Sequence, residues 1–405
     1  MMNTPLIRFK GFTDAWEQRK LGDVADEVKR TDSNSTAPVM MITAQNGFIE
    51  QSERYAFDNS GESLKKYILL ERGELAYNHG ASKLRPYGSC FALTTKENAR
   101  IPFVYHCFSV RDGDPEFIST ILNGSQTESQ LRKIVSSGAR MDGLLNISYQ
   151  EYCSISILLP KIEEQHEISE LFRSLDHLIT LHQREYDKTV NIKKAMLEKM
   201  FPKDGATVPE IRFKGFTDAW EQRRLREVAD IVRGASPRPI KDPKWFDDES
   251  DIGWLRISDV TEQDGRIHFL EQHISEAGQE MTRVLTEPHL LLSIAATVGK
   301  PVINYVKTGV HDGFLIFQNP NFDREFMFQW LEMFRPKWSK YGQPGSQVNL
   351  NSDLVKGKDI MLPNMEEQSK IGSFFHSLDH LITLHQRELQ KLQNIKKSLL
   401  EKMFV

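Results

Sequence analysis

Residues 174–185 read SLDHLITLHQRE, and residues 377–388 repeat these twelve letters without a change. Apolar residues recur around each copy with steps of three and four, from Ile168 to Ile179 and from Ile371 to Ile382. This spacing places them on one face of an α-helix. Pro160 and Pro202 bound the first pattern, so the sequence predicts one long helix between them and a second, equivalent helix near residue 405.

A second repeat opens each half of the chain. Residues 7–26 and 211–230 differ at three of twenty positions, with an offset of 204 residues against 203 for the helix motif. Each half therefore runs from an opening motif through a variable region to a long helix. The predicted segments are a first domain with the opening motif (1–160), a central helix (161–203), a second domain with the repeated motif (204–362) and a distal helix (363–405).

The two predicted helices need a partner along their length. About 38 residues at about 1.5 Å each give a rod of about 57 Å with one apolar stripe. The simplest partner is the other copy, paired antiparallel about a pseudo-twofold axis, and the alternative is that each rod packs only on its own domain. The predicted fold is α+β, with two mixed α/β domains joined by two long antiparallel helices. We expect helix packing from Leu175, Ile179, Leu378 and Ile382.

The variable regions, 27–159 and 231–362, have the pattern of mixed α/β domains. Short β-like runs lie between Gly, Pro, Asn and Asp residues. These runs are residues 67–70, 101–110, 155–159, 254–257, 290–294 and 314–317. Residues 201–210 contain two prolines and a glycine and form the predicted linker.

Composition limits the class of protein. The chain has 405 residues, 39% hydrophobic and 27% charged, as in ordinary globular proteins. The net charge of −4 argues against a uniformly basic nucleic-acid binder, but leaves local basic patches open. Cys90, Cys107 and Cys153 lack metal-like spacing and are interpreted as reduced thiols. A polar start and a broken apolar stretch at 290–306 predict a cytoplasmic protein.

Motifs for catalysis, cofactors or metals are missing. Gly299-Lys300 is not a phosphate loop, because the first glycine and the Ser/Thr of that motif are replaced. The histidines of the helix motif lie five residues apart on each helix, which does not place two ligands on one face. We interpret them as interface or surface residues: His177, His182, His380 and His385. We expect no catalytic residue, metal or cofactor in this chain.

A third repeated segment precedes each helix. Residues 158–165 read LLPKIEEQ and residues 361–368 read MLPNMEEQ. With the opening motif and the helix, this duplication resembles the specificity subunit of a type I restriction-modification system. Residues 252–260 and 291–300, and loops 137–140 and 344–350, also resemble segments of that family. The resemblance covers essentially the whole chain, although the first variable domain departs most from the pattern.

The resemblance implies a non-catalytic reader of double-stranded DNA. Each variable region would be a target recognition domain for one half of a bipartite, asymmetric site, and the helices would set the gap. Two methyltransferase subunits, which bring S-adenosylmethionine for adenine methylation, would dock on the conserved regions. Restriction subunits that use ATP and Mg would complete the complex. Partner binding and core packing are both open for Phe12, Trp16, Phe216 and Trp220.

Polar, basic and turn-rich loops are the predicted DNA contacts, because such side chains bind phosphates and base edges. For each arginine the alternative is a solvated surface charge. The predicted residues are Asn78, Ser82, Lys83, Arg85, Tyr87 and Arg140 in the first domain, and Arg233, Arg238, Lys241, Lys244, Ser346 and Gln347 in the second.

Two rival interpretations remain. The chain could be a stand-alone nuclease or methyltransferase, against which the missing motifs argue. It could also be an interaction scaffold that binds two protein partners and no nucleic acid, for which the weak negative charge is the best support.

Overall fold

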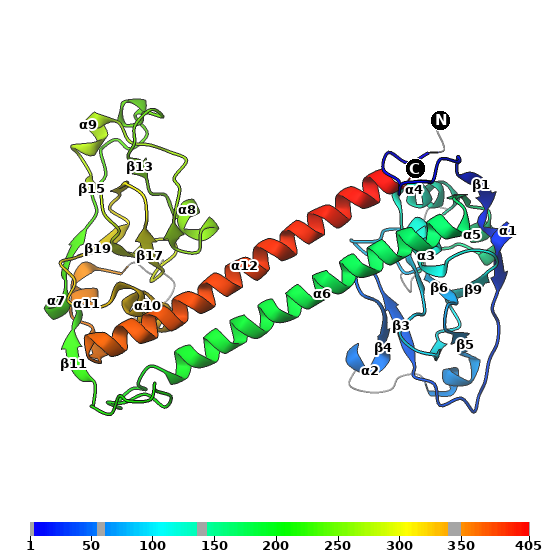
Figure 1. The fold of residues 1–405 in the computed structure, drawn as a ribbon, viewed down its shortest axis with the longest axis horizontal. Coiled ribbons are helices and arrows are strands. Elements are labelled where there is room, and N and C mark those ends of the chain that lie inside the picture. Colours follow the sequence, from blue (N-terminus) through cyan, green and yellow to red (C-terminus); the bar gives the residue numbers. More distant parts are fainter. Residues whose placement is uncertain (1–3, 55–60, 136–143, 339–349, 405) are drawn as a thin grey trace. The chain divides into compact units, whose positions relative to one another are not determined.

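A computed structural model describes residues 4–54, 61–135, 144–338 and 350–404 of the chain. The chain forms two compact units: unit 1 is Met1–Leu181 with Glu388–Val405, and unit 2 is His182–Arg387. The two predicted variable domains lie in different units, and each long helix contributes residues to both (Figure 1).

The two predicted long helices are present. They are α6 (Ile162–Lys199) and α12 (Met365–Met403), and each carries two glutamates in its first turn, where the helix dipole favours acids. In unit 1, Asp176 of α6 forms an ion pair with Lys396 of α12. The rings of Phe172 and Phe404 lie 5.8 Å apart. The earlier residue of the first segment, Phe172, contacts the later residue of the second, Phe404, so the two segments run antiparallel.

The same direction holds in unit 2. His182 contacts His385, and the Lys193 ammonium lies 2.5 Å from the Asp379 carboxylate. The predicted antiparallel pairing is therefore confirmed within each unit.

Unit 1 contains the first variable domain. Its largest sheet is antiparallel, in the order β2-β9-β6-β7, and β3-β4, β5-β8 and β1-β10 form two-stranded sheets. The strands are β1 (Glu17–Lys20), β2 (Ala25–Glu27), β3 (Met40–Thr43), β4 (Gly47–Glu50), β5 (Ile68–Glu71), β6 (Leu75–Asn78), β7 (Ser89–Ala92), β8 (Asn98–Ile101), β9 (His106–Val110) and β10 (Ser156–Leu159). The helices are α1 (Leu21–Val24), α2 (Gln51–Arg54), the 3-10 helix η1 (Gly61–Lys66), α3 (Pro115–Leu122), α4 (Ser125–Ile134) and α5 (Tyr149–Cys153).

Unit 2 contains the second variable domain, with a different sheet. Five strands run in the order β12-β19-β16-β17-β14, with β14 parallel to β17, and β13-β18-β15 form a three-stranded sheet. The strands are β11 (Glu221–Arg224), β12 (Asp230–Arg233), β13 (Gly253–Trp254), β14 (Arg266–Ile267), β15 (Arg283–Leu285), β16 (Leu290–Ser293), β17 (Pro301–Asn304), β18 (Thr308–Val310), β19 (Phe314–Gln318) and β20 (Asp359–Leu362). The helices are α7 (Leu225–Val228), the 3-10 helix η2 (Pro243–Trp245), α8 (Ile257–Glu262), α9 (Glu276–Gln279), α10 (Arg324–Trp338) and α11 (Ser352–Lys356).

Most predicted strands are confirmed, and one is wrong in part. The runs 67–70, 155–159, 290–294 and 314–317 correspond to β5, β10, β16 and β19, and the run 101–110 holds the end of β8 and all of β9. In the run 254–257, the strand ends at Trp254 and helix α8 begins at Ile257. Asp259 causes this change, because its carboxylate accepts a hydrogen bond from the Arg256 main-chain N–H at 2.8 Å and caps the helix.

The repeated opening motif closes each unit against the segment before its long helix. β1 pairs with β10 and β11 pairs with β20, both antiparallel and in the same register. Arg8 then forms an ion pair with Glu164 at 2.7 Å, and Arg212 forms the equivalent pair with Glu367 at 2.6 Å. Both glutamates are fully buried. The bidentate hydrogen bonds from each guanidinium offset the free-energy cost of desolvating each carboxylate.

Residues 159–165 and 362–368 share the pattern LPxxEEQ. The glutamine that ends this LPxxEEQ segment binds the residue that precedes another helix, α3 in unit 1 and α10 in unit 2. The side-chain oxygen of Gln165 accepts from the Asp114 main-chain N–H at 3.0 Å, and Gln368 does the same for Asp323 at 2.9 Å. Each aspartate caps its helix, α3 or α10. The third repeat thus joins the long helix to the domain that it supports.

Candidate nucleic-acid interface

The densest basic loop of unit 2 follows β12 and is held by Asp312. Its main-chain oxygen accepts a hydrogen bond from Arg233 at 2.6 Å, and its carboxylate accepts from Arg238 at 2.7 Å and from the Ser236 hydroxyl at 2.8 Å. Burial raises the pKa of Asp312, but the Ser236 hydrogen bond and Arg238 outweigh it and lower the pKa. The Arg238 side chain stays 71% exposed, so the loop presents an ordered basic edge.

Two lysines extend this edge. Lys241 is exposed, and the Lys244 ammonium lies 4.3 Å from the centre of the Trp245 ring and 3.3 Å from the Asp242 carboxylate. The structure therefore brings four of the predicted contacts of the second domain together on residues 233–244.

A hollow of about 270 Å³ lies next to the basic loop. Hydrogen bonds from Arg256 to Asp259 (2.7 Å) and to Glu271 (3.0 Å) hold its guanidinium and raise its pKa. Burial lowers the pKa of His311, which favours the neutral ring. The Trp254 ring offers an apolar contact to this hollow, and the side chains around it offer hydrogen-bond donors and acceptors, which are the kinds of group that contact base edges. The hollow is lined in part by Ser236, Arg238, Trp254, Arg256, His311 and Asp312.

The predicted loop of the first domain is a compact turn whose arginine points inward. The Arg85 main-chain N–H donates to the Ser82 hydroxyl at 3.0 Å, and its guanidinium donates to the Asn123 main-chain oxygen at 2.6 Å. Among the described residues its Nε is buried without a hydrogen-bond partner, and burial lowers the pKa of this group. Arg85 therefore anchors the loop to the end of α3.

The other predicted residues of this loop divide into two groups. The Asn78 amide donates to the Ile42 main-chain oxygen at 3.0 Å, and the Tyr87 main-chain oxygen accepts from the Tyr77 hydroxyl at 2.6 Å. Ser82 and Lys83 are exposed. Both side chains are therefore accessible to solvent. Arg140, Ser346 and Gln347 lie outside the described residues.

The predicted packing residues differ in burial. Trp16, Trp220, Leu175 and Leu378 are buried in the cores of their units. The remaining four are half-buried: Phe12, Ile179, Phe216 and Ile382. The two tryptophans thus belong to the core, whereas Phe12 and Phe216 are only partly covered, and the Lys370 ammonium lies 4.7 Å from the centre of the Phe216 ring.

Unit 2 also holds a charged cluster that the sequence does not predict. Arg266 of β14 binds Glu325 at 2.8 Å and Asp379 at 2.9 Å, and Asp379 also binds Lys193 at 2.5 Å. These side chains are 14–20% exposed. Asp379 lies in the repeated motif and could have been suspected, but Arg266 has no sequence signal, since it belongs to a variable region.

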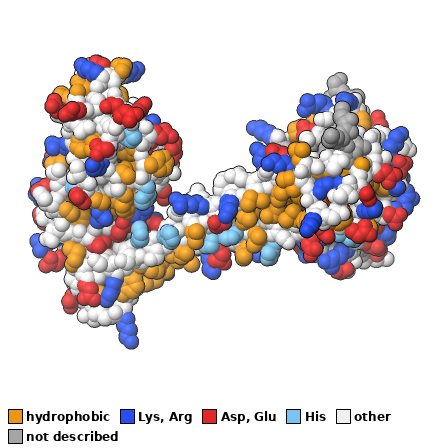
Figure 2. Space-filling model, turned by 45° about the horizontal axis from the view of Figure 1, so that its top comes forward, with side chains coloured by type: hydrophobic (Ala, Val, Ile, Leu, Met, Phe, Trp, Pro, Cys, Tyr) orange, Lys and Arg blue, Asp and Glu red, His pale blue; other side chains and the backbone are white. Residues whose placement is uncertain are grey.

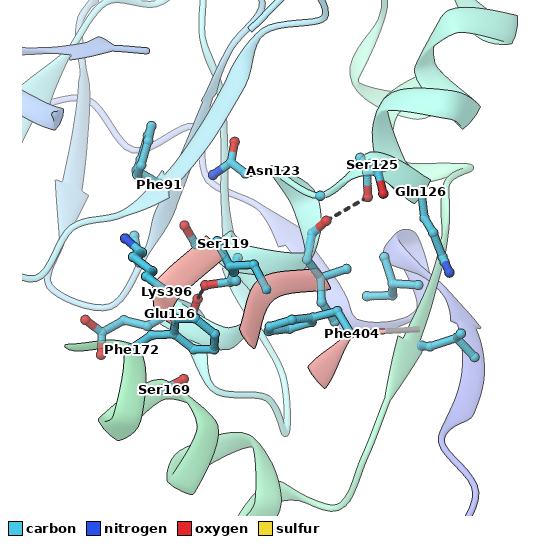
Figure 3. Close-up of a pocket in the computed structure, with 18 of the residues that line it drawn as sticks. Phe91, Glu116, Ser119, Asn123, Ser125, Gln126, Ser169, Phe172, Lys396 and Phe404 are labelled. Carbon is cyan, nitrogen blue, oxygen red and sulfur yellow. Dashed lines mark hydrogen bonds between the residues drawn. The ribbon is translucent and has the colours of Figure 1, made fainter. Parts of the chain in front are cut away.

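The equivalent acids of unit 1 line a pocket of about 700 Å³ (Figure 3). Glu116 pairs with Arg173, and Asp176 pairs with Lys396. The aromatic rings of Phe172 and Phe404 line the same pocket (Figure 3). Because each acid has its own cation, these ion pairs add no net positive charge that would attract a phosphate backbone.

Exposed apolar side chains recur on both long helices. Figure 2 shows hydrophobic side chains gathered along the helical part of the chain. Leu178 and Leu181 of α6 are 41% and 46% exposed, and Leu381 and Leu384 of α12 are 42% and 46% exposed. These pairs occupy the same positions of the repeated motif, so the two helices present the same apolar patch.

Residues 217–394 match the family model of the type I restriction modification DNA specificity domain. The type I restriction enzyme MjaVIII specificity subunit of Methanocaldococcus jannaschii is 23% identical over 277 residues, which are 64% of this chain and 63% of that protein. Much of the chain therefore resembles type I restriction enzyme specificity subunits. The putative MjaX specificity subunit of the same organism is 22% identical over 264 residues, 63% of this chain and 60% of that protein.

The chain spans about three fifths of the length of these curated relatives. The fold is similar to solved structures over nearly the whole chain. The S subunit of the type I system from M. genitalium aligns with a TM-score of 0.62 at 13% identity, over 99% of both chains. A chain from a structure of type I R-M complex assembly and conformational transition aligns with a TM-score of 0.52 at 16% identity, over 98% of this chain and 99% of that one. The specificity-subunit fold is thus shared.

Within the described ranges, no group of three or more His, Cys, Asp or Glu residues is placed to hold a metal ion. No helix in that part of the chain is long and apolar enough to cross a membrane.

Proposed function

We propose that this chain is the non-catalytic DNA-recognition subunit of a type I restriction-modification complex. Each variable domain reads one half of a bipartite, asymmetric site in double-stranded DNA, and the helix pair sets the gap between the halves. The observation that carries this proposal is that one repeated scaffold supports two different sheets. Two domains that share the repeated scaffold but differ in their sheets can recognise a site whose two halves differ in sequence.

Two copies of a methyltransferase subunit dock on the repeated parts. The apolar patches on α6 and α12 support this step, because identical surfaces bind identical partners. Phe12 and Phe216 are half-buried and lie in the repeated opening motif, so they too offer equivalent apolar contacts to two identical partners. S-adenosylmethionine belongs to these partners, and ATP and Mg belong to restriction subunits that join the complex. The place of action is the cytoplasm, where DNA and thiols such as Cys90 coexist.

Methylation mapping tests the proposal. The chain is co-expressed with its cognate methyltransferase subunit in a host without adenine methylation, and the modified bases are sequenced. We expect one split motif with a methylated adenine in each half. No new methylation, with the complex shown to form, would favour the scaffold that binds no nucleic acid.

Lys241→Ala is expected to weaken DNA binding about equally for all sequences. Lys241 is exposed on the basic edge, and a phosphate contact carries no sequence information. Without this one phosphate contact, the plot of log affinity against log salt concentration should become less steep by about 1. Fluorescence anisotropy with duplex DNA at several salt concentrations measures both quantities. Lys214→Ala is the control, since Lys214 is exposed in the opening motif and lies outside residues 233–244. An unchanged slope for Lys241→Ala would remove Lys241 from the interface.

A further inference from the structure

The antiparallel helix pair brings one histidine of the repeated motif against its own copy. His182 and His385 occupy the same position of the motif. Their Nδ1 atoms lie 3.3 Å apart, and their ring centroids lie 5.6 Å apart at an interplanar angle of 53°. Each helix supplies one histidine at this position of the motif. Because the two copies of the motif contact each other here, the pair together supplies two possible ligands.

The separation of the two nitrogens fits a tetrahedral metal ion. Zinc binds imidazole nitrogen at about 2.0–2.1 Å with tetrahedral angles, which places two such nitrogens about 3.3–3.4 Å apart. Two adjacent nitrogens of a square-planar site would be about 2.9 Å apart. The separation of 3.3 Å between the two Nδ1 atoms is close to the tetrahedral value.

We propose that His182 and His385 bind one zinc ion between α6 and α12 through their Nδ1 atoms. A hydrogen bond between the two atoms at 3.3 Å would require one Nδ1 to carry the proton that the other accepts. Binding moves that proton to Nε2 of the same ring, so both Nδ1 lone pairs face the ion and two neutral imidazoles become its ligands.

The surroundings indicate an open and exchangeable site. Both rings are half-buried, which leaves solvent access for water to complete the coordination. The acid one turn along α6, Glu185, is bound by Lys188 at 3.5 Å. Since structural zinc sites use four protein ligands, a site with two binds more weakly and exchanges its ion with the medium.

The ion would link the two helices within unit 2. It would fix the register of α6 against α12 at this point, because a one-turn slip moves the nitrogens about 5.4 Å apart along the axis. Zinc binding here would be independent of the proposed DNA function. His182 and His385 would be metal ligands rather than plain interface residues.

Calorimetric titration of the full chain with zinc chloride tests the proposal. We expect one ion per chain, and loss of this binding in His182→Ala and in His385→Ala. The matched controls are His177→Ala and His380→Ala, because these exposed histidines belong to the same motif on the same helices. The controls should bind zinc as the natural chain does.

A second measurement separates metal binding from folding. Zinc should raise the thermal unfolding midpoint of the natural chain and of both controls, but not that of His182→Gln or His385→Gln, which keep a polar group at the contact. Circular dichroism checks that each variant retains its helix content. The proposal is overturned if the natural chain binds no zinc, or if the His182 and His385 variants bind it like the controls.

Discussion

Asp379→Ala is expected to lower the free energy of unfolding by about 3 kcal/mol. The Asp379 carboxylate binds the Lys193 ammonium at 2.5 Å and the Arg266 guanidinium at 2.9 Å, and it accepts from the Gln329 amide at 2.8 Å. Its removal leaves Lys193, only 17% exposed, without its counter-charge. Breaking a buried pair from one side costs more than the pair contributes, because the remaining charge stays desolvated. Urea unfolding followed by circular dichroism measures the change.

The repeat provides the matched control. Asp176 is the same residue of the motif in unit 1, where its pair with Lys396 is 54% exposed on the acid side. Asp176→Ala should therefore cost no more than about 1 kcal/mol. Equal losses for the two variants would contradict the structural contrast between the units.

The same cluster predicts a dependence on pH. Burial alone raises the pKa of Asp379, but Lys193 and Arg266 outweigh it and lower the pKa. A carboxyl whose folded pKa lies below its unfolded value stabilises the protein above the unfolded pKa, and this stabilisation is lost as the pH falls through the folded pKa. The difference in unfolding free energy between the natural chain and Asp379→Ala should therefore be largest near neutral pH and shrink in acid.

Insertion of four residues into both long helices is expected to widen the DNA gap by about two base pairs. The insertions follow Leu181 in α6 and Arg387 in α12, where one unit ends and the other begins. Four residues add about 6 Å of helix, and base pairs are spaced by about 3.4 Å. Every ion pair described above lies within one unit and is retained. Methylation mapping should find unchanged bases in both half-sites.

This result rests on the proposed function, and a second insertion separates spacing from damage. Four residues placed after Gly205 lengthen an exposed segment without helix or strand, where an added side-chain carbon meets no atom within 4 Å. The gap should not change in that variant. An unchanged gap in the helix variant, with methylation retained, would exclude the helices as the spacer.

The repeats made the scaffold predictable. Two copies of SLDHLITLHQRE with a period of 3.6 were enough for both long helices and for their antiparallel pairing. The LPxxEEQ segment is a visible pattern in the sequence, but its contacts are not predictable from it, because Glu164 and Gln165 bind residues far away in the sequence. Helix periodicity is local, whereas such contacts are not.

The candidate interface was less predictable. A basic loop could be read from the composition of residues 233–244, but composition does not show which way a side chain points. Arg85 looked like Arg238 in the sequence, yet one anchors its loop to the Asn123 carbonyl and the other faces solvent. The orientation depends on packing against α3, which a single sequence does not encode in any nearby residue.

The division of each long helix between two units has a consequence for synthesis on the ribosome. Unit 2 is one continuous stretch, His182–Arg387, and can fold once that stretch has emerged. Unit 1 also needs residues from 388 onward, and Met403 is buried in its core. The domain that is translated first is therefore completed last. Until then Phe172 and Leu175 lack their partners on α12, and the nascent chain carries an uncovered apolar surface that chaperones recognise.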